Sequence, residues 1–167
     1  MKRRTLALTI VLTIAAALTL WYIVGSSTPS ESERKASTLE YYKENWGMEF
    51  SEPDRIETIW SSRGWFGDGE SITVMEYVNS NLDLLKQDMN LITDVNLEIV
   101  NHMIRKFTEN TLSMQSNSTE LEHVFEQHNV EVDIHDYYHK QDRNRTNYII
   151  AVYKQNDQKL YILEWYQ

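Results

Sequence analysis

Twenty consecutive residues without a charge, Thr5 to Val24, follow Lys2, Arg3 and Arg4 at the start of the chain. As a helix, a segment of this length extends about 30 Å, the thickness of the hydrocarbon core of a bilayer. The positive-inside rule keeps the basic end in the cytoplasm, so the rest of the chain would face outward. We therefore expect residues 1–24 to form a transmembrane signal-anchor in the cell membrane.

The competing interpretation of this segment is a cleaved signal peptide, which would release a secreted protein. Val24 and Ser26 stand where the small residues of a cleavage site would be, but signal peptides have shorter apolar cores of about 7–15 residues. The length of the uncharged run therefore favours the anchor. Residues 25–37 are rich in serine, contain one of the two prolines and lack apolar periodicity, so we expect a flexible linker there.

The charge and composition of the chain exclude several classes of function. The 167 residues carry a formal net charge of −9, and removal of residues 1–24 with their three basic side chains leaves −12. An acidic chain lacks the basic surface that binds nucleic acid, so we expect no nucleic-acid partner. The chain has no cysteine, which excludes disulfides, thiolate zinc sites and thiol nucleophiles. Its hydrophobic content of 41% is enough for a folded core.

Apolar spacing in residues 38–167 predicts one extracytoplasmic α+β domain, with an antiparallel sheet of about five strands and helices against one face. We expect strands near residues 56–60, 71–78, 130–135, 147–154 and 159–166. The last two would form a C-terminal hairpin.

Helices are expected in three regions of the same domain. Ser37 and Glu40 have the spacing of a capping box, which predicts a short helix beginning at Ser37. Residues 80–112 have an apolar face with one change of phase, which indicates two helices or one kinked helix. A second capping-box spacing predicts a helix from Thr119.

Three of the five glycines, Gly64, Gly67 and Gly69, fall in the stretch RGWFGDGE between the first two expected strands. The pair Asp68-Gly69 suits the positive φ angles found at the tip of a hairpin. Their spacing fits neither the dinucleotide-binding nor the phosphate-binding glycine motif. We therefore expect these glycines to shape a turn.

The same turn is also the candidate binding site. Trp65 and Phe66 would be held out at its tip beside Asp68 and Glu70. Exposed aromatic side chains on a rigid turn are typical binding anchors, and the two carboxylates could attract a cation. These four residues are the binding residues that the sequence suggests.

No catalytic constellation is visible in the sequence. A G-x-S-x-G nucleophile elbow is missing, and spacing alone pairs no two carboxylates as acid and base. His135 and His139 lie in a predicted strand region, where side chains four residues apart are separated by about 13 Å, too far to share one metal. We expect exposed histidines, no metal site, no catalytic residue and no cofactor.

Two stretches, WSSRGWFGDGE and NYIIAVYKQNDQKLYILEW, resemble a group of small exported or membrane-anchored proteins of Gram-positive bacteria. That group has a G-G-F-H-G-D-G-E turn after a strand, and a C-terminal hairpin with Ala-Val-Tyr and Leu-Tyr. This chain has Trp65 in place of the second glycine, lacks the turn histidine, and has Lys154 where the group often has aspartate. The resemblance implies the architecture of two hairpins and no reaction.

Three classes of function remain open. We favour a membrane-anchored extracytoplasmic binding or interaction module, with an unknown ligand or a membrane or cell-surface protein as partner, because anchor, linker and aromatic turn all fit it. An accessory subunit of a membrane complex would use residues 5–24 as a helix contact. An exported carboxylate- or metal-dependent enzyme is supported only by the acidic surplus and the histidines.

Overall fold

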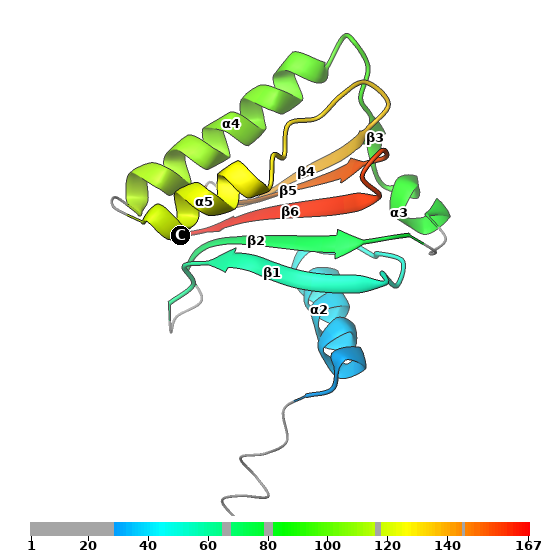
Figure 1. The fold of residues 1–167 in the computed structure, drawn as a ribbon. Helices are drawn as coiled ribbons and strands as arrows, with labels where there is room; N and C mark the ends of the chain where they lie inside the picture. Colours follow the sequence, from blue (N-terminus) through cyan, green and yellow to red (C-terminus); the bar gives the residue numbers. More distant parts are fainter. Residues whose placement is uncertain (1–28, 65–67, 79–81, 116–117, 145) are drawn as a thin grey trace, which may run out of the picture. The chain divides into compact units, whose positions relative to one another are not determined.

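The fold is a six-stranded antiparallel sheet with helices, which confirms the α+β class (Figure 1). The computed structural model describes residues 29–64, 68–78, 82–115, 118–144 and 146–167. The chain divides into two units, residues 1–34 and residues 35–167, and the second unit contains the sheet. The strand order in the sheet is β1-β2-β6-β5-β4-β3.

The elements follow one another along the chain as α2, β1, β2, α3, β3, α4, α5, β4, β5 and β6. The strands are β1 (Arg55–Ser61), β2 (Gly69–Glu76), β3 (Asn90–Leu91), β4 (Tyr137–Arg143), β5 (Asn147–Lys154) and β6 (Lys159–Tyr166). The helices are α2 (Glu31–Trp46), α3 (Asp83–Gln87), α4 (Leu97–Met114) and α5 (Thr119–Gln127). The expected C-terminal hairpin is β5 and β6, in the middle of the sheet.

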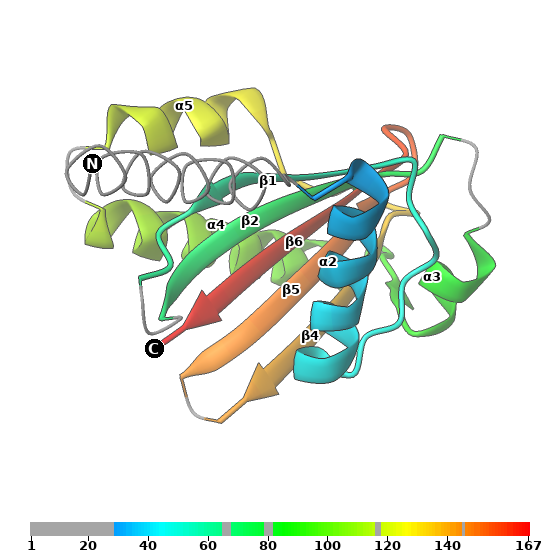
Figure 2. The same cartoon turned by 90° about the horizontal axis from the view of Figure 1, so that it is seen from below.

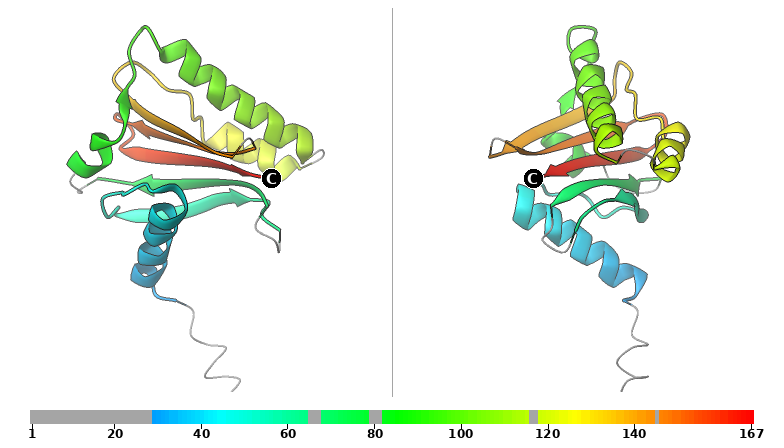
Figure 3. Two further views of the ribbon diagram at one scale, coloured as in Figure 1. Left: turned by 180° about the vertical axis from the view of Figure 1, so that it is seen from behind. Right: turned by 90° about the vertical axis from the view of Figure 1, so that its left-hand side faces the viewer.

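Helices lie on both faces of the sheet, whereas we expected them on one face only (Figure 1; Figure 3). Helices α4 and α5 cover the first face, where Val100, Ile104 and Phe107 pack against strand residues such as Ile150 and Leu163. Strand β5 is apolar on both sides, and such a strand must be covered twice to keep its side chains from water. The double covering follows from that pattern.

The second face is covered by the part of α2 from Lys35 onward, which crosses β6, β5 and β4 (Figure 2). Tyr42 and Trp46 of this helix are each 2% exposed. They belong to a core cluster that includes Tyr153 of β5 and Ile162 of β6. Helix α2 therefore completes a second core on the face opposite α4.

Helix α2 begins at Glu31, not at Ser37 as the capping-box spacing predicted. The structure instead uses a capping box formed by Ser30 and Glu33. The backbone N–H of Ser30 donates to Glu33 Oε2 at 2.7 Å, and the backbone N–H of Glu33 donates to Ser30 Oγ at 3.2 Å. Residues 31–37, which we had placed in the flexible linker, are helical.

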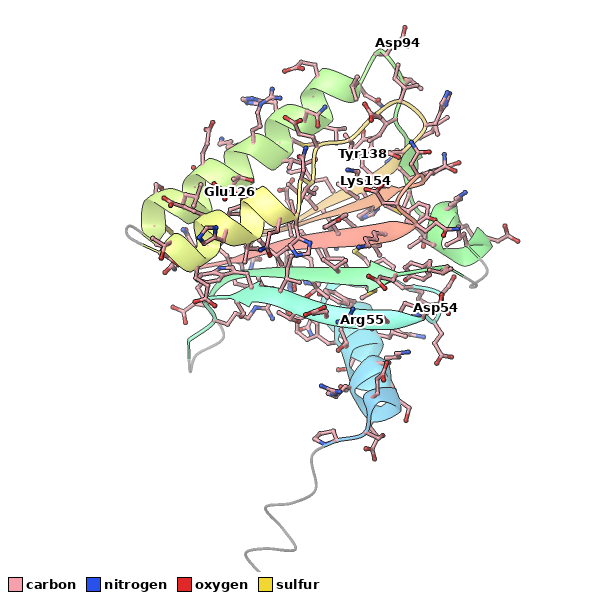
Figure 4. All side chains as sticks on the ribbon, viewed as in Figure 1. Asp54, Arg55, Asp94, Glu126, Tyr138 and Lys154 are labelled. Atoms are coloured by element: carbon pink, nitrogen blue, oxygen red, sulfur yellow. The ribbon has the colours of Figure 1, made fainter. Side chains whose placement is uncertain are left out.

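The expected strand at residues 130–135 is wrong. Val130 and Val132 are buried, so the apolar alternation was real, but this segment pairs with no strand. The side chain of Asn101 takes the place of a partner strand: its Nδ2 donates to the carbonyl of Val132 at 3.1 Å, and its Oδ1 accepts from the N–H of Val132 at 3.0 Å. Lys154, labelled in Figure 4, donates to the carbonyl of Asn129 at 3.1 Å.

The expected helical region at residues 80–112 contains two helices, α3 and α4, with the short strand β3 between them. Strand β4, which follows the 128–136 segment, was not expected. Among the residues that the structure describes, no helix is both long enough and apolar enough to span a membrane. The expected anchor, residues 5–24, lies outside the described residues.

Candidate functional site

The connection between β1 and β2 is a turn closed by backbone hydrogen bonds. The N–H of Ser62 donates to the carbonyl of Glu70, and that of Gly64 donates to the carbonyl of Asp68, each at 2.9 Å. Gly69 has φ +124°, and a Cβ there would lie 2.8 Å from Ser62 Oγ and 3.0 Å from the Ser62 carbonyl carbon. Only glycine fits this position, because both the backbone angle and the space exclude a side chain.

The sequence-suggested binding residues do not form one cluster among the described residues. Asp68 is exposed, whereas Glu70 is buried on the face that α4 covers. The carboxylate of Glu70 accepts from the hydroxyl of Ser62, and Gln115 Nε2 lies 3.5 Å from it. Trp65, Phe66 and Gly67 lie outside the described residues. In the structure, Glu70 thus helps to close the turn.

The turn places Arg63 on the opposite face of the sheet, beside the second core. Its guanidinium carbon lies 5.2 Å from the ring centroid of Tyr41 and 5.2 Å from that of Tyr166. Its Nη2 lies 2.8 Å from Oε2 of Glu164. Two aromatic rings and one carboxylate therefore fix the position of this cation.

Glu164 is the buried centre of this group, with 1% of its surface exposed. Its Oε1 accepts from Trp46 Nε1 at 2.7 Å and from the Tyr41 hydroxyl at 2.9 Å. Its Oε2 accepts from the Ser71 hydroxyl at 3.1 Å and faces Arg63. All four neighbours are donors, which matches the acceptor-only chemistry of a carboxylate. Glu164 therefore joins α2, β2 and the 62–70 turn to β6.

Electrostatics within the group hold Arg63 and Tyr41 in their protonated forms. Burial acts to lower the pKa of Arg63, but its interactions with the charged Glu164 and with Tyr41 outweigh burial, and the pKa is raised. Burial, followed by the charge of Glu164, raises the pKa of Tyr41. Tyr41 thus remains a donor to the carboxylate at neutral pH.

A cleft of about 310 Å³ opens beside this group. Besides Arg63 and Glu164, its lining consists entirely of hydroxyl-bearing residues: Ser37, Thr38, Tyr41, Tyr42, Thr58, Ser61, Ser71 and Thr73. The Nε atom of Arg63 is buried and has no hydrogen-bond partner, whereas Nη2 pairs with the Glu164 carboxylate. The site therefore offers one buried donor, Nε of Arg63, that nothing in the described chain satisfies.

Sequence reasoning missed Arg63, Tyr41 and Glu164 as members of one site. A signal for Glu164 was present, because it stands within an apolar run whose residues are buried on both faces of the strand. A charge at an inward position indicates a buried partner. No comparable signal identifies Arg63, which stands outside the regular part of the strand.

The remaining polar candidates do not form a metal centre of the usual type. Among the residues that the structure describes, no three histidine or carboxylate side chains gather to hold a metal ion. His135 has φ 81° in the turn before β4, and His139 lies within β4.

Comparison of the chain with protein families, with curated proteins and with solved structures found no match. The geometry of the cleft beside Arg63 and Glu164 is therefore the basis for a functional proposal.

Proposed function

We propose that this chain is a membrane-anchored extracytoplasmic binding module that takes a small, neutral, polar ligand in the cleft beside Arg63 and Glu164. The observation that carries the proposal is the buried Nε–H of Arg63, which has no partner although Arg63 lines an open cleft. Buried donors are normally satisfied, so an oxygen atom of a ligand would satisfy this one.

The charge balance of the cleft favours a neutral ligand. Among the described residues that line it, Arg63 and Glu164 are the only charged ones, and they neutralise each other. A hydroxyl-rich wall offers both donors and acceptors, which suits the hydroxyl and amide oxygens of a saccharide unit. The chain carries −9 overall, which further disfavours an anion.

Thermal unfolding of the full chain in detergent micelles tests the cleft, with neutral saccharides and neutral amides as probes. A ligand present at about a hundred times its Kd should stabilise the fold by about 2.7 kcal/mol. Arg63→Lys keeps the charge but removes the planar set of donors, so it should abolish the shift. Arg55→Lys, at an exposed ion pair with Glu57, is the matched control and should respond as the parent does. No shift with any probe, or an unchanged shift in Arg63→Lys, would contradict the proposal.

The anchored location rests on residues 2–24 and has its own test. Protease added to intact protoplasts should degrade the part after residue 37, because the basic end is expected to remain in the cytoplasm. Protection of that part would mean that the topology is inverted. A mature chain that begins near Ser27 in the medium would favour the cleaved signal peptide over the anchor.

An accessory subunit of a membrane complex is the second candidate, and exposed apolar side chains favour it. Val95 is 83% exposed and Ile99 is 61% exposed, close to the loop at Asp94 (Figure 4). Purification of the intact chain from membranes should then recover one stoichiometric membrane protein. The double variant Val95→Asp/Ile99→Asp should lose it, while Lys106→Asp, on the helix that carries Ile99, should retain it.

A further inference from the structure

A second cavity, separate from the Arg63 cleft, lies beside β4 on the face that α2 covers. Its volume is about 270 Å³, and its lining comes from the segment after α2, from α3 with the residues that follow it, and from β4. Figure 2 shows the chain leaving α2 beside β4 and passing α3 before it reaches β1. Three segments that are distant in sequence therefore enclose this space.

His139 points one ring nitrogen at the backbone and leaves the other without a partner. Its Nδ1 lies 2.9 Å from the carbonyl oxygen of Asp88. A carbonyl only accepts, so Nδ1 carries the proton and Nε2 of the neutral ring presents a lone pair. That Nε2 is buried and has no hydrogen-bond partner. A histidine oriented in this way, through one nitrogen bonded to a carbonyl, is typical of metal ligands.

The other side chains around this cavity determine which metal would fit. Met48 and Met89 line it together with His139. Two carboxylates, Glu49 and Asp88, also line it, and Glu49 pairs with Lys43 at 2.7 Å. Because no three histidine or carboxylate side chains gather in the described part of the chain, a hard or borderline ion lacks a full ligand set. Thioether sulfur and imidazole nitrogen are instead ligands that suit Cu⁺.

We propose that His139, Met48 and Met89 form a binding site for a soft monovalent metal ion, Cu⁺. The imidazole Nε2 supplies one ligand and the two thioethers supply the others, without any change in oxidation state. The orientation of the His139 ring is already fixed, because its Nδ1 bonds to the backbone carbonyl of Asp88. The surplus of negative charge on the chain favours a cation at this place. The site is independent of the ligand proposed for the Arg63 cleft.

Titration with Ag⁺, a redox-inert ion of the same ligand preference, tests the site in the full chain in detergent micelles free of thiols and chloride. With methyl-labelled methionine, six methionine signals report on the chain, and single Met→Leu variants assign them. We expect one equivalent of Ag⁺ to shift the Met48 and Met89 signals and to leave that of Met114, which is 56% exposed, in place. Competition with a Cu⁺ chelator then measures affinity for Cu⁺ itself.

Ligand variants separate this site from binding elsewhere. His139→Ala should weaken Cu⁺ binding by on the order of tenfold or more, since even changes outside the ligand shell cost that much. His102→Ala, at an exposed position on α4, is the matched control and should bind as the parent does. Met48→Leu and Met89→Leu conserve volume, so circular dichroism should show an intact fold while binding falls. A first shift at Met114, a uniform drift of all signals, or unchanged affinity in His139→Ala would overturn the proposal.

Discussion

Glu164 carries the strongest prediction at the scale of single residues. Glu164→Gln should lower the free energy of unfolding by about 3 kcal/mol, because it leaves the half-buried Arg63 cation without its counter-charge. Urea denaturation of the full chain in micelles measures the loss. Glu57→Gln, at an exposed ion pair with Arg55, is the matched control and should change stability by less than about 0.5 kcal/mol. Equal effects of the two substitutions would mean that the Arg63–Glu164 pair contributes nothing to the fold.

Gly69 carries the second prediction at this scale. Gly69→Val should cost at least about 1–2 kcal/mol, because a valine is strained at φ +124° and its Cβ would contact the backbone of Ser62. Gly64→Ala lies in the same turn, where a Cβ would meet only a flexible carboxylate oxygen of Asp68 at 3.4 Å. Denaturant midpoints compare the two. A Gly69→Val protein as stable as Gly64→Ala would contradict the structural role of this turn.

The sequence predicted the turn at residues 62–70, but it predicted only part of the site around that turn. The glycines of RGWFGDGE indicated a special backbone, and Gly69 has the positive φ that such a turn needs. The apolar run of β6 places Glu164 among buried residues, so its side chain is buried whichever face it points to. Its partners could not be inferred, because Tyr41 and Trp46 are more than a hundred residues away in sequence and reach it only through the placement of α2. The position of Arg63 depends on the path of the turn, and no periodicity of the sequence predicts that path.

At the scale of elements, the apolar pattern of the sequence predicted which residues are buried better than it predicted which segments pair as strands. The central strands β5 and β6 followed directly from their apolar runs. Residues 130–135 had the alternation of a strand, and Val130 and Val132 are indeed buried. Their backbone is satisfied by a side chain rather than by a strand, which alternation cannot distinguish. Strand β4 was missed because its sequence, YYHKQDR, is too polar for a strand pattern.

Asn101 should therefore behave as a substitute for a strand. Asn101→Ala removes two hydrogen bonds to the buried Val132 backbone, which should cost about 2–3 kcal/mol and increase amide exchange at Val132. Lys106→Ala, at an exposed position on the same helix, controls for the change in helix composition. Hydrogen exchange measured by NMR reports on both variants. Unchanged protection of the Val132 amide in Asn101→Ala would show that this segment is held by packing alone.

At the scale of the whole molecule, buried phenols predict alkaline instability. Burial is the first cause of a raised pKa in six tyrosines, and it raises the pKa of Tyr148 to about 12. The six are Tyr41, Tyr42, Tyr77, Tyr148, Tyr153 and Tyr161. The folded state holds these protons more tightly than the unfolded state. The resulting stability is therefore complete below about pH 10, the unfolded pKa of tyrosine, and is lost as the pH rises through the folded values.

Phenolate absorbance in the near ultraviolet checks this prediction. The folded chain should titrate at higher pH than the same chain in concentrated urea, and its late phase should coincide with loss of circular dichroism. Coincident titration curves for the folded and unfolded chains would mean that these phenols are accessible to water.

The two core clusters on opposite faces of the sheet predict which part of the chain can fold on its own. Residues 29–167 should unfold cooperatively with the midpoint of the full chain, because every described member of both core clusters lies within them. Residues 47–167 lack Tyr42 and Trp46, each of which covers the second face and is worth several kcal/mol, about 3–5 for a buried tryptophan. They also lack two of the four donors to Glu164, so a buried carboxylate is left undersatisfied. The shorter chain should bind a hydrophobic dye and lose its cooperative transition. If it unfolds as the longer chain does, α2 is an accessory to the sheet and not a layer of the fold.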